Sequence, residues 1–133
     1  MNRLKLLDTF GLVRFFKDEP GADKVEKILT AAKQSRQSLV MSEINAGELF
    51  YTTACKEGER RAEEILGSLT LFRISLIPAT WALVLEAARL KSKYPLSYAD
   101  CFAVATAIKQ EAVLVTGDPE FKHVKDLIEI EWI

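Results

Sequence analysis

The sequence predicts an α/β fold: a three-layer α/β/α sandwich around a central, mostly parallel sheet of about four to five strands. The main observation is that short apolar runs alternate with longer amphipathic segments along the whole chain, as in βαβ units. The second is the length of 133 residues, which suits one compact domain with its own core. No repeat, low-complexity tract or long linker divides the chain, so residues 1–133 are expected to form a single domain.

The first third of the chain contains one strand and two helices. Residues 4–7, LKLL, are an apolar run typical of a buried strand. Residues 11–18 are predicted to form a short helix, which Pro20 and the glycine after it end. Residues 22–35 have helical periodicity and form the next helix.

The middle of the chain follows the same alternation. Residues 38–41, SLVM, suit a second strand, and 71–76, LFRISL, suit a third. Between them lie two helical segments, 43–57 and 59–68, separated by Gly58.

The last third adds two helices and two strands. Residues 79–93 form a helix bounded by prolines, and 98–111 form another. The run AVLVT at 112–116 is rich in β-formers, a short helix follows Pro119, and a final strand covers about 128–132.

Composition and charge limit the possible functions. About half of the residues (49%) are apolar and the formal net charge is −1, so no overall basic field indicates nucleic-acid binding. The single histidine, His123, excludes HExxH chemistry and most zinc sites. Cys55 and Cys101 form no CxxC pair and are expected to be buried thiols in a reducing cytoplasm. No signal peptide is recognised, and the longest uncharged stretch, 74–85, is too short to span a bilayer.

Two aspartates follow predicted strands. Asp8 comes after LKLL, and Asp118 comes after AVLVTG. Ligands of open parallel sheets bind beyond the carboxyl ends of the strands, which is where both side chains are expected. Each also suits a helix N-cap, since Asp is a favoured cap and Pro119 a favoured first helical residue. Taken singly, the cap interpretation is the stronger for both.

Two further acids lie at positions that favour burial. Glu48 shares a helical stripe with Ile44, Tyr51 and Cys55, where periodicity expects an apolar residue. A Glu at the edge of that stripe, reaching water, is an equally good interpretation. Asp100 enters a helix that carries no charge from 101 to 108, although a capping box with Ser97 would also explain an acid there.

The four acids together indicate more than each does alone. If they converge, unit charges ~4 Å apart repel by several kcal/mol, at an effective dielectric constant of ~20. A multivalent cation relieves that repulsion without protonating them. Ligands that are all oxygen favour Mg²⁺ or Mn²⁺ over Zn²⁺.

Four sequence elements resemble the PIN-domain ribonucleases, and most closely the VapC-type toxins of prokaryotic toxin–antitoxin pairs. They are LLDTFGLV, SEINAGEL, PLSYADCFAVATA and VTGDPEF, and their order and spacing cover essentially the whole chain. The resemblance implies a PIN-like fold and an acidic cluster that holds one or two Mg²⁺ or Mn²⁺ ions. It matches the metal-binding and catalytic acids to four residues: Asp8, Glu48, Asp100 and Asp118.

The resemblance also implies hydroxyl groups beside the acids, at Thr9 and Thr116, and we include Thr116 among the site residues. One departure is Gly117, where many relatives have Asn; all four acids remain in place. Glu43 is the nearest rival to Glu48, but five residues separate them, so it faces elsewhere on the helix.

The implied activity is hydrolysis of RNA phosphodiester bonds. Asp8 and Asp100 are the principal expected metal ligands, and Glu48 or Asp118 would assist as general base. The implied partners are an RNA substrate, a VapB-type antitoxin and a second copy of the chain in a homodimer. Basic residues near the predicted edge could contact phosphate, although each is individually better explained as a solvated charge: Arg14, Lys17 and Lys122.

Other functions fit less well. A haloacid-dehalogenase-like phosphatase would need an acid two residues after Asp8, and a receiver domain would need a lysine in TGDPEF. No GxGxxG or P-loop occurs. Two alternatives on the same fold stay open, an RNA-processing nuclease outside a toxin system and a non-catalytic interaction module.

Overall fold

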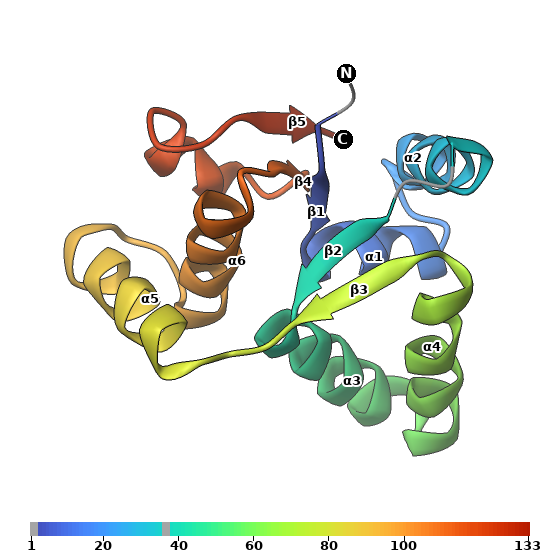
Figure 1. Cartoon of the computed structure of the whole chain (residues 1–133). Helices are drawn as coiled ribbons and strands as arrows, with labels where there is room; N and C mark the ends of the chain where they lie inside the picture. The colour runs from blue at the N-terminus through green and yellow to red at the C-terminus, as the bar shows by residue number, and fades with distance from the viewer. Residues whose placement is uncertain (1–2, 36–37) are drawn as a thin grey trace.

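The computed structural model describes residues 3–35 and 38–133, and it has a central sheet between two helical layers (Figure 1). The sheet has five parallel strands in the order β3-β2-β1-β4-β5. This confirms the predicted three-layer α/β/α fold. The strands are β1 (Lys5–Leu7), β2 (Leu39–Ser42), β3 (Ile74–Ile77), β4 (Val113–Thr116) and β5 (Ile130–Trp132).

The helices divide between the two faces of the sheet. On one face lie α5 (Trp81–Lys93), α6 (Tyr98–Gln110) and the 3₁₀ helix η1 (Pro119–Val124). The other face is covered by α1 (Thr9–Phe16), α2 (Ala22–Ser35), α3 (Glu43–Glu57) and α4 (Glu59–Leu71). Among residues 3–35 and 38–133, no helix combines the length and apolar character needed to cross a membrane.

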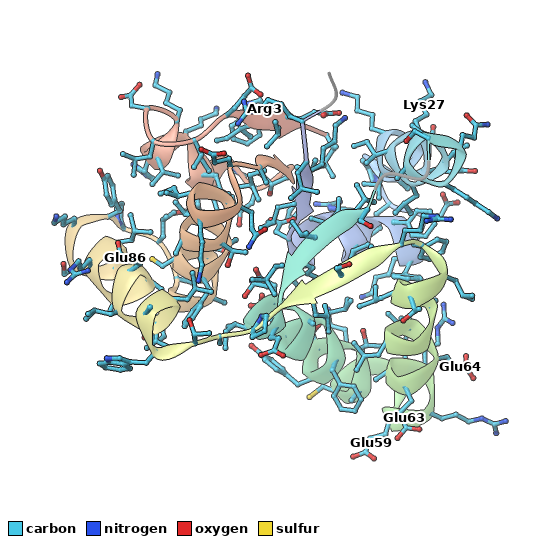
Figure 2. The ribbon with its side chains drawn as sticks, in the orientation of Figure 1. Arg3, Lys27, Glu59, Glu63, Glu64 and Glu86 are labelled. Carbon is cyan, nitrogen blue, oxygen red and sulfur yellow. The ribbon has the colours of Figure 1, made fainter. Side chains whose placement is uncertain are left out.

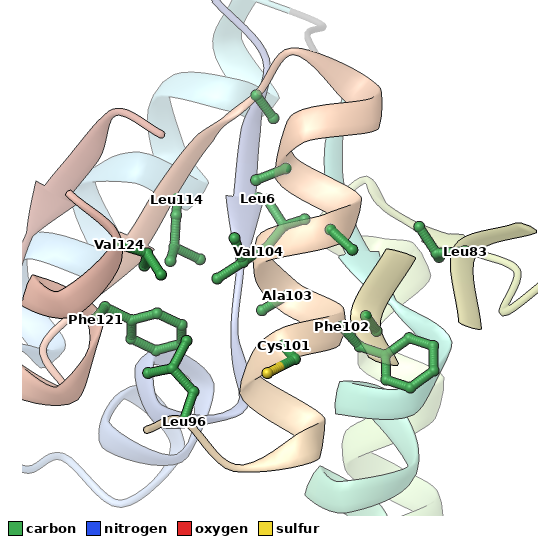
Figure 3. Close-up of a cluster of buried hydrophobic side chains, with 14 of the residues drawn as sticks. Leu6, Leu83, Leu96, Cys101, Phe102, Ala103, Val104, Leu114, Phe121 and Val124 are labelled. Carbon is green, nitrogen blue, oxygen red and sulfur yellow. The ribbon is translucent and has the colours of Figure 1, made fainter. Parts of the chain in front are cut away.

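Neighbouring residues of each strand point into different layers, because side chains alternate along a strand. Leu6 and Leu114 pack with α5, α6 and η1, as the close-up in Figure 3 shows. Leu7 and Val115 pack with the helices of the opposite layer. This two-sided burial explains why the strands read as continuous apolar runs and not as alternating patterns.

The strand order creates a switch point between β1 and β4. The chain passes from β1 outward to β2 and β3, then returns to place β4 on the other side of β1. In register, Leu6 pairs with Leu114 and Leu7 with Val115, so both strands end at the same level. Open parallel sheets bind ligands in the crevice at such a switch point. The residues that follow Leu7 and Val115 are therefore placed at the expected site.

Several predicted boundaries are wrong by a few residues. The largest error concerns 71–76: α4 continues to Leu71, and β3 begins only at Ile74. The chain leaves the helix through Arg73, whose φ of 62° is left-handed. Leu71 is 76% exposed, so its apolar character does not reflect membership of a buried strand. The last strand similarly begins at Ile130 and not at 128.

Capping residues account for the differences at two helix starts. The Asp8 side chain caps α1, which begins at Thr9 and not at 11. Thr80 caps α5, so that helix begins at Trp81 and not at 79. Gly58 lies between α3 and α4, as predicted.

The two cysteines are both free thiols. Cys101 is fully buried on α6, as predicted. The predicted burial of Cys55 is wrong: it is exposed, because α3 turns a different face to the core. Charged side chains lie on the outer surface of the neighbouring helix, where Glu59, Glu63 and Glu64 of α4 point into solvent (Figure 2).

Phe121 gives a test of the core beside the switch point. It is fully buried among the side chains of α6 and η1 (Figure 3). We expect Phe121→Ala to lower the free energy of unfolding by about 3–5 kcal/mol, because it removes a large buried side chain and leaves a cavity. Urea unfolding measures this. Tyr51→Ala, at a side chain that is 58% exposed, is the matched control and should change it by less than about 0.5 kcal/mol. Equal losses in both variants would contradict the assigned core.

Candidate active site

Asp8 lies at the carboxyl end of β1 and is almost fully buried. Its Oδ1 accepts a hydrogen bond from the Gly11 amide at 2.9 Å, and its Oδ2 accepts one from the Thr116 hydroxyl at 2.7 Å. The Thr116 Oγ1 also accepts a hydrogen bond from the Asp118 amide at 3.1 Å. Thr116 thus joins the ends of β1 and β4 and connects two of the predicted site residues.

Asp118 follows β4 and caps η1. Its Oδ1 accepts a hydrogen bond from the Glu120 amide at 3.0 Å, with Pro119 at the first helical position. The cap interpretation is therefore confirmed for Asp8 and for Asp118. It does not compete with a place in the site, because the same short helix entries bring both carboxylates to the switch point.

Asp100 lies in the first turn of α6. Ser97 is the N-cap, and its Oγ accepts a hydrogen bond from the Asp100 amide at 3.1 Å. The helix is buried from Cys101 to Ala107, as its lack of charge predicts. Asp100 itself is only half-buried, at the end of the helix that faces the switch point.

Glu48 lies near the other acids, but the stripe that suggested it is not buried. The residues of α3 that face the core are Asn45, Ala46, Leu49 and Thr53. Tyr51 is 58% exposed and Cys55 is exposed, so the predicted apolar face of α3 is wrong. The reason is that this face includes two buried polar residues, Asn45 and Thr53, beside Ala46 and Leu49, and a search for apolar periodicity overlooks polar positions. Glu48 is half-buried at the edge of the packed face.

Three of the predicted acids line one cavity of about 530 Å³. Glu48, Asp100 and Asp118 lie on its wall, while the buried Asp8 is not among the lining residues. Cations also line it. These are Arg14, Lys17 and Lys56, of which the sequence analysis named the first two; Lys122 is exposed on η1 and does not line the cavity.

Burial and repulsion raise the pKa values of two acids. Burial raises the pKa of Asp8 from 3.8 to about 7, against hydrogen bonds from Thr116 and Gly11 that lower it, and Asp100 and Asp118 raise it further. Burial is also the main cause that raises the pKa of Asp100 to about 6, and the nearby negative charge of Asp118 is the second cause. Glu48 adds to the repulsion on Asp100. The charges of Asp100 and Asp118 therefore act on Asp8, and those of Asp118 and Glu48 act on Asp100.

The sequence analysis missed a fifth acid and a buried amide. Glu120 is close enough to raise the pKa of Asp100, and its place beside the Asp118 cap was the available signal. Asn45 is fully buried in α3, and its Nδ2 donates to the carbonyl oxygen of Ala99 at 3.1 Å. The Thr9 hydroxyl donates to the carbonyl oxygen of Asn45 at 2.9 Å.

Asn45 thereby links three helices that carry site residues. Its bonds join α3 to the residue before Asp100 and to the residue after Asp8. Its Oδ1 is buried and has no hydrogen-bond partner among residues 3–35 and 38–133. A polar residue at an inward position of a helix, with a short side chain, was the sequence signal for it.

Gly117 is explained by the residue opposite to it. A Cβ atom on Gly117 would stand 2.6 Å from Cε1 of Phe10 and 3.1 Å from the carbonyl oxygen of Ile133. A side chain at position 117 would require the Phe10 ring to move, because that ring occupies the space where a Cβ would stand.

Glu43, the rival of Glu48, has a different place. Its Oε1 accepts a hydrogen bond from the Ala79 amide at 3.1 Å, in the connection between β3 and α5. It does not line the cavity. Glu48 is therefore the residue of this helix that lies with the other acids.

The donor set of the site suits a hard cation. The metal-binding groups at the site are carboxylates, and two of them, Asp8 and Asp100, have pKa values raised toward neutrality, as expected where a compensating cation would bind. In the described part of the chain, no group of three Asp, Glu, His or Cys side chains is already placed to hold a metal ion. Mg²⁺ is commonly held by one or two carboxylates with water completing its shell, so the residues fit such an ion and not a cage made entirely by protein.

A family model of the PIN domain matches residues 5–127. The chain belongs to the PIN-domain family. This confirms the family indicated by the four sequence motifs. A comparison with curated protein sequences finds no match.

Solved structures share this PIN-domain fold over nearly the whole chain. A structure of VapBC2 from Rickettsia felis, bound to a DNA fragment from its promoter, matches with a TM-score of 0.77 and 19% identity over 98% of each chain. DNA-bound VapBC from Salmonella typhimurium matches with a TM-score of 0.76 and 18% sequence identity over 98% of each chain. VapC20 from Mycobacterium tuberculosis is described as a sarcin–ricin loop cleaving toxin. It matches with a TM-score of 0.72 and 15% sequence identity, over 90% of this chain and 94% of that one.

The raised pKa of Asp8 predicts how pH changes the stability of the metal-free protein. The folded protein holds a proton on Asp8 up to about pH 7, whereas an ordinary Asp with a pKa of 3.8 loses it much earlier. The resulting stabilisation is present below pH ~4 and is lost as the pH rises through about 7. The Asn side chain of Asp8→Asn cannot ionise. In EDTA, the free energy of unfolding of this variant minus that of the unsubstituted protein should therefore increase by a few kcal/mol as the pH rises from about 4 to about 8. A constant difference across that range, measured by urea unfolding, would contradict a buried, proton-holding Asp8.

The contact between Gly117 and Phe10 gives a second test. We expect Gly117→Ala to lower the free energy of unfolding by about 1–3 kcal/mol, because the added methyl group overlaps the ring. Phe10→Leu removes the overlapping Cε1, so the cost should be smaller in the double variant, and thermal unfolding of the four proteins measures this coupling. Gly67→Ala on α4, where a Cβ meets nothing within 4 Å, is the control and should not destabilise. Strictly additive effects would refute the contact.

Proposed function

We propose that this PIN-domain protein is a Mg²⁺- or Mn²⁺-dependent endoribonuclease, and that it is the toxin of a VapBC-type toxin–antitoxin pair. The observation that supports the proposal is that Glu48, Asp100 and Asp118 line one cavity, while the buried Asp8 lies at the switch point and Asp100 and Asp118 are close enough to raise its pKa. Family membership supports nuclease chemistry in general. The cleaving toxin among the structural relatives supports RNA as the substrate.

Asp8 and Asp100 are the proposed principal metal ligands, with Asp118 and Glu48 completing the acidic cluster. Burial and mutual repulsion raise the pKa values of Asp8 and Asp100, and a bound divalent cation removes both costs by favouring the charged carboxylates. The cation supplies acidification of bound water and stabilisation of charge on the phosphate. Thr116 is fully buried, so its proposed role is to hold Asp8 and the Asp118 backbone in place.

The remaining chemistry falls to side chains on the cavity wall. Glu48 and Asp118 both line the cavity and are the proposed candidates for the general base that takes a proton from the attacking water. The Oδ1 of Asp118 already accepts a cap bond from the Glu120 amide, whereas the half-buried Glu48 lines the same cavity from α3. We therefore favour Glu48 as the base.

An RNA backbone can be held in the cavity despite the net charge of −1. Arg14, Lys17 and Lys56 line the wall together with the acids, and they provide a local positive patch for phosphate. The single-stranded or looped form is the proposed substrate, because the phosphodiester bond must reach acids that lie in or below a cavity.

Partner binding follows from the toxin assignment. Structural relatives are VapBC complexes, which supports a VapB-type antitoxin as the partner. Exposed apolar side chains suit contacts with an antitoxin or with a second copy in a homodimer; they include Tyr51, Leu71 and Trp81. A cytoplasmic location is proposed on the same basis, with both cysteines as free thiols.

Cleavage of a short single-stranded RNA tests the nuclease proposal. We expect cleavage with Mg²⁺ or Mn²⁺ and none with EDTA. Asp8→Asn and Asp100→Asn should each lower the rate at least about a hundred-fold, because each removes a proposed ligand of the catalytic cation. Asp126→Asn is the matched control. Asp126 is exposed and lines a different cavity with Glu111, so the variant should cleave RNA at the unsubstituted rate. Unchanged cleavage by either site variant would falsify the metal-cluster mechanism.

The assay also separates the alternatives. A protein that binds RNA but never cleaves it, under any divalent cation, would be a non-catalytic module on the PIN fold. Cleavage with no antitoxin-like gene beside its own would favour an RNA-processing nuclease over a toxin. Light scattering on a size-exclusion column tests the homodimer, and a monomer at micromolar concentration would count against it.

A further inference from the structure

Phe10 is placed beside the acidic cluster but takes no part in the metal chemistry. We propose that Phe10 and Arg14 form a binding surface for a nucleobase of the substrate, so that the base next to the cut phosphate stacks on this pair. The inference rests on the proposed ribonuclease function and deepens it, because it assigns the residues that grip a base and not only the backbone.

The Phe10 ring lies on the wall of the acid-lined cavity. It is half-buried and shares that wall with Glu48, Asp100 and Asp118. Phe15, Phe16 and Phe72 are half-buried like Phe10, but their rings pack against one another. Phe10 has no such aromatic partner among the described residues; its ring edge lies against Gly117, and the ring offers an apolar surface to a ligand in the cavity.

The lack of a side chain at Gly117 leaves room for the ring. Its Cε1 lies only 2.6 Å from the position that a Cβ of residue 117 would take. The Arg14 guanidinium lies over the ring, with Cζ 4.7 Å from the ring centroid. This cation–π contact comes from one turn further along α1, so ring and guanidinium are carried by one rigid helix.

A nucleobase matches this surface better than other ligands of similar size. Bases stack on aromatic rings and on guanidinium planes, and the interaction tolerates any base because each has a π-face. The positive charge of Arg14 also lies where the phosphate joined to that base would need a cation, among carboxylates that repel it. Ring, guanidinium and acids together thus suit a nucleotide unit of a single strand.

Binding of a short single-stranded RNA, and of the same oligomer with one abasic position at a time, tests the proposal. Fluorescence anisotropy in Ca²⁺ gives the Kd, and a gel checks that the probe stays intact. For the unsubstituted protein, one abasic position should weaken binding by about ten-fold, as loss of a stacked base does. For Phe10→Leu, which keeps apolar bulk but no π-face, binding of the intact RNA should be weaker by a similar factor and that abasic position should have no further effect.

Two controls separate stacking from folding and from charge. Phe15→Leu makes the same substitution on the same helix, at a ring that packs against Phe72 and does not line the cavity, and it should leave both Kd values unchanged. Arg14→Lys keeps the charge but loses the flat guanidinium, so it should lessen the effect of the abasic position while retaining the dependence of Kd on salt.

The outcomes distinguish this site from the proposed activity. An abasic scan of the unsubstituted protein with no sensitive position overturns the base-binding surface, even if Phe10→Leu fails to fold. Equal sensitivity of Phe10→Leu and the unsubstituted protein overturns it as well. If Mg²⁺-dependent cleavage is observed in either of these cases, the ribonuclease function stands without the base site. If the unsubstituted protein neither binds nor cleaves RNA, both proposals fail.

Discussion

The bond between the Thr116 hydroxyl and the Asp8 carboxylate is the interaction on which the site depends. It spans the ends of the two strands that flank the switch point, and the same hydroxyl holds the Asp118 amide. A carboxylate as buried as Asp8 is costly unless its oxygens are satisfied, and here the hydroxyl and the Gly11 amide satisfy both. Asp8 caps α1 and Asp118 caps η1, so one hydroxyl group connects the capping residues of two helices and holds two acids near each other.

The sequence was sufficient for the architecture because strands buried on both faces are continuous apolar runs. That property holds for β2 and β4 and for most of β1, whereas the edge strands β3 and β5 are partly exposed and were located from their β-rich composition; the parallel direction then followed from the helices between strands. Boundaries were less certain where local side-chain bonds decide them. Leu71 reads as part of a strand but belongs to α4, and its exposure depends on how that helix packs, which no local pattern records. Asp8 and Thr80 start their helices earlier or later than apolar periodicity alone indicates.

The site residues that directly follow strands were easier to predict than those on helices. Asp8 and Asp118 follow strand ends, so topology alone places them. Glu48 lies on the wall of the cavity, but the stripe that suggested it is only partly buried: Tyr51 and Cys55 are exposed, and α3 packs through Asn45, Ala46, Leu49 and Thr53. Asn45, Glu120 and Lys56 were missed because their significance lies in contacts between helices that are distant in sequence.

The fit between Phe10 and Gly117 has a consequence for how this protein can vary over evolutionary time. The two positions are far apart in the chain, yet a side chain at one lies where the ring of the other now stands. A larger residue at 117 therefore costs stability while residue 10 keeps its ring, and a smaller residue 10 lessens that cost. Changes at the two positions should therefore accumulate together and not independently.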